Sequence, residues 1–127
     1  MISHIVLFRP RADLSQGDRA AFGETLARVR EDIPSIRGFR VGRRVTHGRG
    51  YEQVMRENFS FAAVIDFDDL AGLQSYLEHP AHAKISELFA ATLEAALVYD
   101  YEMWEDAAAA RELAAEPPGS GSPAKKN

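Results

Sequence analysis

FSFAAVIDFDDLAGLQSYLEHPAH, residues 59–82, contains two hydrophobic periods in direct succession. Large apolar side chains alternate with smaller or polar ones up to Phe67, which is the two-residue period of a β-strand. Leucines then recur at helical spacing, after Asp68 or Asp69 as the helix N-cap. Pro80 suits the first position of a new helical turn, so we expect the helix to break there and then resume. The stretch predicts a strand followed by a broken helix.

The segments on either side of this stretch supply the remaining elements. Residues 2–9 (ISHIVLFR) predict a strand that is largely apolar on both sides, and Pro10 ends it. Residues 15–33 predict an amphipathic helix with a serine N-cap. Residues 36–46 predict a second strand, bent or bulged at its two glycines. A last strand, at about residues 96–104, is apolar on both sides except for Asp100 and Glu102.

The predicted order, β-α-β-β-α-β, is that of an α+β, ferredoxin-like fold. Such a fold has a four-stranded antiparallel sheet with both helices on one face. The helices cover only one face, yet the first and last strands are apolar on both sides. The chain has no further element large enough to cover the second face. We therefore expect a two-fold homodimer that stacks sheet against sheet.

The length of 127 residues allows one domain, which we place at residues 1–104. We expect an Ala-rich C-terminal helix over residues 105–116 and a disordered tail over residues 117–127, which are rich in Pro, Gly and Ser. The sequence has no cysteine, which excludes disulfides, thiolate zinc sites, Fe–S clusters and cysteine nucleophiles. Its apolar runs are too short to span a bilayer, and its N-terminus lacks signal-peptide features. We expect a cytoplasmic protein without a membrane partner.

RNA-recognition motifs share this element order, so nucleic-acid binding has to be weighed. The predicted strand at residues 59–67 should turn its aromatic rings toward the helices. Its other side has no ring on which a base could stack, because it carries Ser60, Ala62, Val64 and Asp66. The formal net charge of −4 also weakens attraction to phosphate. We expect no nucleic-acid partner.

Six arginines between residues 37 and 56 form a local basic cluster around a polar loop at residues 47–58. Three roles are open for this cluster: a solvated loop face, a set of salt bridges in the dimer, or a gate for an anionic substrate. The sequence alone does not choose among them.

Short motifs in the right order resemble those of a known family. They are HIVLF at residues 4–8, the strand at residues 61–67 that leads to YxxHPxH at residues 76–82, and VYDYE at residues 98–102. Together they cover residues 2–104 and resemble the stress-responsive A/B barrel (Dabb) family. The resemblance implies a ferredoxin-like monomer and a dimer whose two sheets form a dimeric α/β barrel.

The resemblance also implies a possible chemistry. One group of the family, plant polyketide cyclases, closes a linear polyketide by intramolecular aldol condensation without a cofactor. Its catalytic tyrosine and second histidine match Tyr76 and His82, and a pocket histidine matches His4. An aldol cyclisation needs a base with a near-neutral pKa and a donor that stabilises the enolate oxygen. His82 would be the base and Tyr76 the hydrogen-bond donor of a cyclase or isomerase.

Each of these residues also has a structural interpretation. Tyr76 could be an ordinary core residue, His79 could cap the helix that follows Pro80, and His82 could be a buried, hydrogen-bonded histidine. The alternative function is therefore a non-catalytic ligand-binding or stress-response dimer with no enzymatic activity.

Either function needs a pocket between sheet and helices for a small apolar or carbonyl-bearing ligand. The predicted lining is His4, Val6, Phe8, Phe22, Leu26, Phe61, Ala63, Ile65, Ile85, Leu93 and Val98. Phe61 stands where the plant cyclases have another pocket histidine, and Gly23 and Leu26 stand where they have aromatics. We expect a pocket of different shape, and hence a different substrate.

A metal site formed by His4, His79 and His82 is conceivable, because imidazole binds zinc, copper or nickel. No Asp or Glu in these motifs clearly completes the ligand set, and the spacing matches no recognised zinc motif. We expect neither a metal nor a cofactor.

Overall fold

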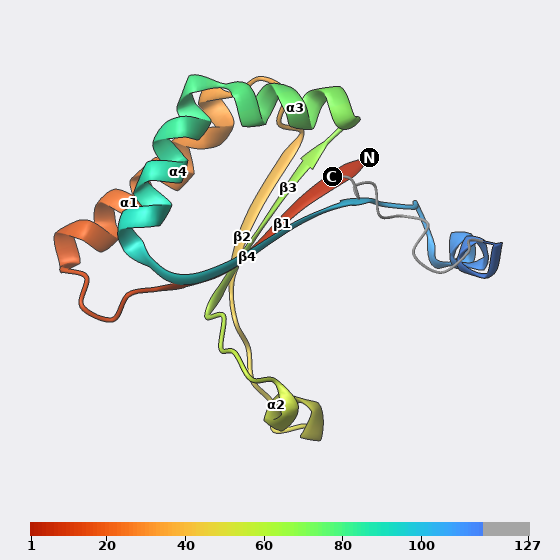
Figure 1. The fold of residues 1–127 in the computed structure, drawn as a ribbon, viewed down its shortest axis with the longest axis horizontal. Coiled ribbons are helices and arrows are strands. Elements are labelled where there is room, and N and C mark those ends of the chain that lie inside the picture. Colours follow the sequence, from red (N-terminus) through yellow and green to blue (C-terminus); the bar gives the residue numbers. More distant parts are fainter. Residues whose placement is uncertain (116–127) are drawn as a thin grey trace.

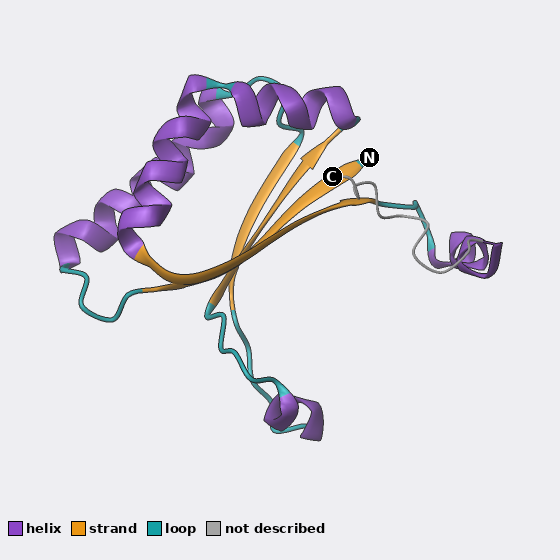
Figure 2. Cartoon of the chain, in the orientation of Figure 1, coloured by secondary structure: helices purple, strands orange, loops and turns teal. Residues whose placement is uncertain are grey.

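The structure, a computed structural model, describes residues 1–115. Four strands form its sheet: β1 (Ile2–Pro10), β2 (Gly38–Arg43), β3 (Phe61–Phe67) and β4 (Leu93–Glu102). The helices are α1 (Gln16–Asp32), α2 (Gly50–Val54), α3 (Leu70–Glu78) and α4 (Pro80–Thr92), followed by a 3₁₀-helix, Ala107–Ala115. Figure 2 shows the strands gathered in one sheet.

The sheet is antiparallel throughout and has the strand order β2-β3-β1-β4. β1 lies between β3 and β4, so that Ile2 is opposite Phe67 on one side and Glu102 on the other. Helices α1, α3 and α4 all lie on one side of the sheet (Figure 1). This arrangement confirms the predicted α+β, ferredoxin-like fold.

Local capping explains where the helices begin. The Ser15 side chain accepts a hydrogen bond from the Asp18 backbone N–H, and the Asp18 carboxylate accepts one from the Ser15 backbone N–H, which completes a capping box. Asp69 caps α3. Pro80 occupies the start of α4, which confirms the predicted break between α3 and α4.

Two clusters of buried side chains fill the layer between sheet and helices. One gathers around Phe67 at the end of the sheet where α3 lies, and the other gathers around Phe8 and Phe22. Phe39 and Phe89 pack against both clusters and so connect them. The candidate site described below lies where the two clusters meet.

The ends of strand β2 and its regularity differ from the sequence-based expectation. β2 spans six residues rather than 36–46 because its partner β3 begins only at Phe61; past that point β2 has no strand to pair with. The register between β2 and β3 is continuous, so the predicted bulge is absent. A side chain at Gly38 would place its Cβ 3.3 Å from Asp66 Oδ2. The close approach of the Asp66 side chain, and not a bulge, therefore explains the glycine at this position.

Residues 44–60 leave the sheet between β2 and β3 as a projection that we call the arm, with α2 at its tip (Figure 1). The sequence predicts only a polar loop there. β4 begins at Leu93 directly after α4, three residues earlier than expected, and ends at Glu102. A register irregularity lies between Arg9 and Pro10, where β1 pairs with β4.

The sheet face away from the helices is mostly apolar, with polar side chains such as Ser3, Asp66 and Arg40 toward its ends and edge, and we call it the open face. It carries Ile5, Leu7, Ala62, Val64, Leu97, Tyr99 and Tyr101, which alternate with the helix-facing residues in register. Tyr99 and Tyr101 are half-exposed, with ring centroids 6.4 Å apart. β3 adds no ring to this face, as predicted, whereas β4 adds these two.

Within residues 1–115, no helix is both long and apolar enough to cross a membrane. The 3₁₀-helix lies within the stretch for which the sequence predicts an Ala-rich helix. The expected tail at residues 117–127 lies outside the described residues, and the domain boundary after residue 104 stays a prediction.

Candidate active site

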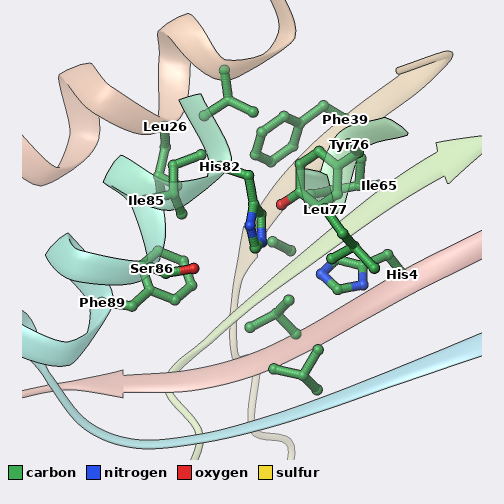
Figure 3. Close-up of a pocket in the computed structure, with 14 residues that line it drawn as sticks. His4, Leu26, Phe39, Ile65, Tyr76, Leu77, His82, Ile85, Ser86 and Phe89 are labelled. Atoms are coloured by element: carbon green, nitrogen blue, oxygen red, sulfur yellow. The ribbon is translucent and has the colours of Figure 1, made fainter. Parts of the chain in front are cut away.

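A cavity of about 340 Å³ lies between the sheet and the helices. That volume falls within the range of about 300–1,000 Å³ typical of small-molecule pockets. We call it the sheet–helix cavity. It is lined by His4, Val6, Leu26, Val29, Phe39, Ala63, Ile65, Tyr76, Leu77, His82, Ile85, Ser86, Phe89 and Val98 (Figure 3).

Three polar rings gather at one end of this apolar cavity. His4 comes from β1, Tyr76 from α3 and His82 from the first turn of α4. The ring centroids are 5.4 Å apart for His4 and Tyr76, and 4.7 Å apart for Tyr76 and His82, and both contacts are edge-on. Figure 3 shows the Tyr76 hydroxyl turned toward the His82 ring. The break at Pro80 is what lets residues on two successive helices meet.

Burial favours the uncharged form of both Tyr76 and His82. Burial, helped by the charge of Asp100, raises the pKa of Tyr76 to about 12, so the phenol keeps its proton. Burial and the nearby His4 lower the pKa of His82 below its ordinary value of 6.5, although a backbone hydrogen bond at Leu77 opposes that shift. At neutral pH the site therefore holds a neutral imidazole beside a neutral phenol.

His4 has a charged partner that the sequence did not reveal. Its Nδ1 lies 2.6 Å from Asp100 Oδ1 on β4. The carboxylate of Asp100 accepts this hydrogen bond, so His4 carries a proton on Nδ1. The His4 residue is 5% exposed, whereas the Asp100 side chain is 41% exposed. Asp100 therefore orients a buried ring that packs on Tyr76.

Residues 2–103 match the family described as Stress responsive A/B Barrel Domain, Dabb. The chain belongs to the Dabb family. Olivetolic acid cyclase of Cannabis sativa is 20% identical over 100 residues, which are 79% of this chain and 94% of that protein.

Solved structures of other proteins share the fold. The hydroxynitrile lyase from Passiflora edulis superposes with a TM-score of 0.71 at 18% identity, covering 83% of this chain and 94% of its own. A dimeric protein of unknown function from Bacteroides fragilis, also described as having a ferredoxin-like fold, superposes with a TM-score of 0.58 at 27% identity. That match covers 80% of this chain and 95% of its own.

The sheet–helix cavity of this Dabb chain brings together most of the predicted site residues. Tyr76, His82, His4, Val6, Leu26, Ala63, Ile65, Ile85 and Val98 all line it.

The other predicted lining residues lie elsewhere. Phe8, Phe22 and Phe61 line a separate cavity of about 240 Å³, which shares Leu26 with the first. The Phe8 ring centroid lies 5.6 Å from that of Phe61 and 5.8 Å from that of Phe22, so the three rings fill the space between them. Leu93, at the junction of α4 and β4, lines neither cavity and packs against the Phe8 cluster.

The sequence-based lining also missed residues that the structure places in the cavity: Val29, Phe39, Leu77, Ser86 and Phe89. Val29 follows Leu26 by three residues on α1, and Ser86 and Phe89 follow His82 by four and seven on α4. Helical spacing from a predicted site residue was therefore the signal that could have found Val29, Ser86 and Phe89. Leu77 directly follows Tyr76, and Phe39 lies on β2, where no such spacing applies.

His79, the other histidine of the family motif, has a structural role. It is the N-cap of α4, where its Nδ1 accepts a hydrogen bond from the Ala81 backbone N–H at 3.0 Å. The structural interpretation of His79 is thereby confirmed. In the part of the chain that the structure describes, no three metal-ligating side chains form a cluster.

The basic cluster lies away from the sheet–helix cavity, since none of its arginines lines it. The interpretation as a gate to that cavity stays a prediction. Arg37 pairs with Asp68 at 2.8 Å and Arg40 with Asp66 at 3.8 Å, both near the surface.

Proposed function

We propose that this Dabb protein is a cofactor-free acid–base enzyme, an aldol-type cyclase or isomerase that acts on an apolar, carbonyl-bearing small molecule. One observation carries the proposal: a neutral imidazole and a protonated phenol are in ring contact at the polar end of an apolar cavity. The similarity to proteins named as a cyclase and as a lyase supports it.

The proposed step is a proton transfer next to a carbonyl group. His82 takes the proton from the carbon α to the carbonyl, and the electron pair of the broken C–H bond moves onto the carbonyl oxygen. The Tyr76 hydroxyl donates a hydrogen bond to that oxygen as it becomes an enolate. A positioned base contributes about 10²–10⁴-fold, and a donor of this kind about 10²–10³-fold. The enolate then attacks a second carbonyl in a cyclase, or is reprotonated at another carbon in an isomerase.

The rest of the site would orient the substrate. Hydrocarbon side chains such as Val6, Ile65 and Ile85 line the cavity beyond the polar rings and would hold an alkyl or aryl group. His4, fixed by Asp100, packs on Tyr76 and so acts as a positioning residue for the phenol.

We also propose that the protein is a homodimer whose subunits stack through the open face, as a dimeric α/β barrel. The exposed Leu97, Tyr99 and Tyr101 on that face support the proposal, as does the dimeric relative from Bacteroides fragilis. The expected cytoplasmic location stays a prediction.

Proton exchange into a simple ketone tests the proposed chemistry without knowledge of the natural substrate. The probe is 4-phenyl-2-butanone in D₂O, whose α-proton loss is followed by NMR while its binding is measured by titration. The variants are His82→Asn and Tyr76→Phe. His79→Asn is the matched control, because asparagine also caps helices well.

We expect saturable exchange with wild type and His79→Asn. We expect the exchange rate of His82→Asn to be at least about 100-fold below that of wild type. The rate of Tyr76→Phe should also fall below that of wild type, while both variants still bind the ketone. Binding without exchange in wild type would contradict the enzyme proposal and favour the non-catalytic ligand-binding dimer. Equal exchange in wild type and His82→Asn would show that His82 is structural.

A further inference from the structure

The arm, residues 44–60, is held in a defined conformation by its own hydrogen bonds. The Glu52 carboxylate accepts from the backbone N–H groups of His47 and Gly48, at 2.9 and 2.7 Å. The Tyr51 hydroxyl lies 2.7 Å from His47 Nε2. At its base, the Arg44 guanidinium donates to the Asn58 side chain at 2.6 Å. A projection built in this way presents a fixed surface.

That surface is apolar at several points, and its apolar side chains stay largely exposed within the subunit. Val45, Tyr51, Val54 and Met55 are each more than half exposed. In Figure 1 the arm extends away from the sheet and from all three covering helices. A cluster of large apolar side chains on an ordered projection is typical of a protein–protein contact.

The arm is also positively charged toward its surroundings. Its two glutamates are engaged within the subunit: Glu52 with the backbone of the arm and Glu57 with Arg9 at 3.0 Å. Among residues 1–115, neither Arg49 nor Arg56 contacts a carboxylate. The surface that fits the arm should therefore be acidic and partly apolar.

The chain itself carries such a surface at residues 102–113, which we call the acidic segment. It contains four acidic residues and one basic residue, and three exposed apolar ones: Glu102, Glu105, Asp106, Glu112, Arg111, Met103, Trp104 and Leu113. It follows β4 at one edge of the sheet, whereas the arm leaves from β2 and β3 at the opposite edge and the opposite end (Figure 1). The two surfaces lie too far apart to meet within one subunit.

We propose that the arm of each subunit docks on the acidic segment of a second copy of this chain. The inference rests on the proposed homodimer and extends it. The arm and the acidic segment are at diagonally opposite corners of the sheet, so a two-fold axis along the other diagonal brings each arm onto the partner's acidic segment. The sheets then cross at a large angle, which is one of the two common modes of sheet packing.

Charge reversal tests this docking in solution. One variant carries Arg49→Glu and Arg56→Glu in the arm, and the other carries Glu102→Lys and Glu105→Lys in the acidic segment. Each homodimer then opposes like charges at both contacts, whereas the mixed dimer has opposite charges at both. The control variant carries Lys84→Glu and Glu87→Lys on the exposed side of α4.

We expect each reversal variant to dimerise at least about tenfold more weakly than wild type in sedimentation equilibrium. In native mass spectrometry of an equimolar mixture of the two reversal variants, the mixed dimer should make up more than half of all dimers, the share expected from random pairing. Added salt should reduce this excess. The control should behave as wild type. Wild-type dimer affinity in both variants, with statistical mixing, would overturn the docking while leaving the homodimer intact. A wild-type monomer would overturn both.

A disulfide test gives an independent measurement, because the chain has no cysteine of its own. A chain with Val54→Cys and Met103→Cys should form disulfide-linked dimers under mild oxidation. A chain with Lys84→Cys and Met103→Cys should not. Equal cross-linking of the two variants would contradict the docking.

Discussion

Asp100→Asn isolates the charge that holds His4. In the wild-type chain His4 Nδ1 lies 2.6 Å from Asp100 Oδ1. Asparagine keeps the shape of the side chain and an oxygen that can accept a hydrogen bond from His4 Nδ1–H. Hydrogen bonds to charged groups contribute about 1.5–3 kcal/mol to stability, but water screens a carboxylate that is 41% exposed. We therefore expect Asp100→Asn to lower the free energy of unfolding by about 1 kcal/mol.

Asp100→Ala should cost more, about 2 kcal/mol, because it leaves the Nδ1–H of a buried ring without a partner. Both variants should also shift the titration of Tyr76. The charge of Asp100 is the second cause of its raised pKa, after burial. Without that charge the pKa of Tyr76 should fall from about 12 while burial keeps it above the ordinary 10.

Urea denaturation at neutral pH and fixed protein concentration measures the first effect, and tyrosinate absorbance against pH measures the second. Glu87→Gln on the exposed side of α4 is the control and should change neither. If Asp100→Asn and Asp100→Ala both unfold with the wild-type free energy, the bond between His4 and Asp100 does not form in solution. The positioning role of His4 would then be wrong.

The pKa of His82 is lower in the folded chain than its unfolded value of 6.5, so stability should fall as pH drops below 6.5 and level off below the folded pKa. His82→Asn should lack this component in urea melts between about pH 5 and pH 8. His79→Ala should cost about 1 kcal/mol by removing the α4 cap, measured by thermal denaturation, with ketone exchange intact. Phe8→Ala should cost about 3–5 kcal/mol in urea unfolding, because the side chain is fully buried. Val64→Asp, which places a charge on the open face, should weaken the dimer in sedimentation more than it lowers the monomer's stability; equal dimer affinity would contradict the stacking.

Most of the fold follows from local patterns in the sequence. The alternation that ends at Phe67, the serine and aspartate caps, and the proline at position 80 each act within a few residues, and all of them appear in the structure as expected. The ends of β2 and the length of the arm did not follow from such patterns. They depend on where the partner strand begins, and that is decided by pairing across the sheet.

The site residues, too, were predictable where they depend on a local motif and not where they depend on strand pairing. Tyr76 and His82 are six residues apart in a single motif, so their meeting was predictable. Asp100 reaches His4 only through the register of β1 with β4, across 96 positions of sequence, and no local pattern contains that register. Their sheet and helix faces placed Phe8, Phe22 and Phe61 in the pocket, but the three rings pack on one another and line a neighbouring cavity instead.

The pH profile of ketone proton exchange tests the proposed acid–base site most directly. At saturating 4-phenyl-2-butanone, the exchange rate should rise through one inflection below pH 6.5 and then stay level up to neutral pH. The inflection should coincide with the titration of the His82 ring followed by NMR, and it should vanish in His82→Asn. An inflection that persists in His82→Asn, or a wild-type rate that does not change across the His82 titration, would contradict the assignment of His82 as the base.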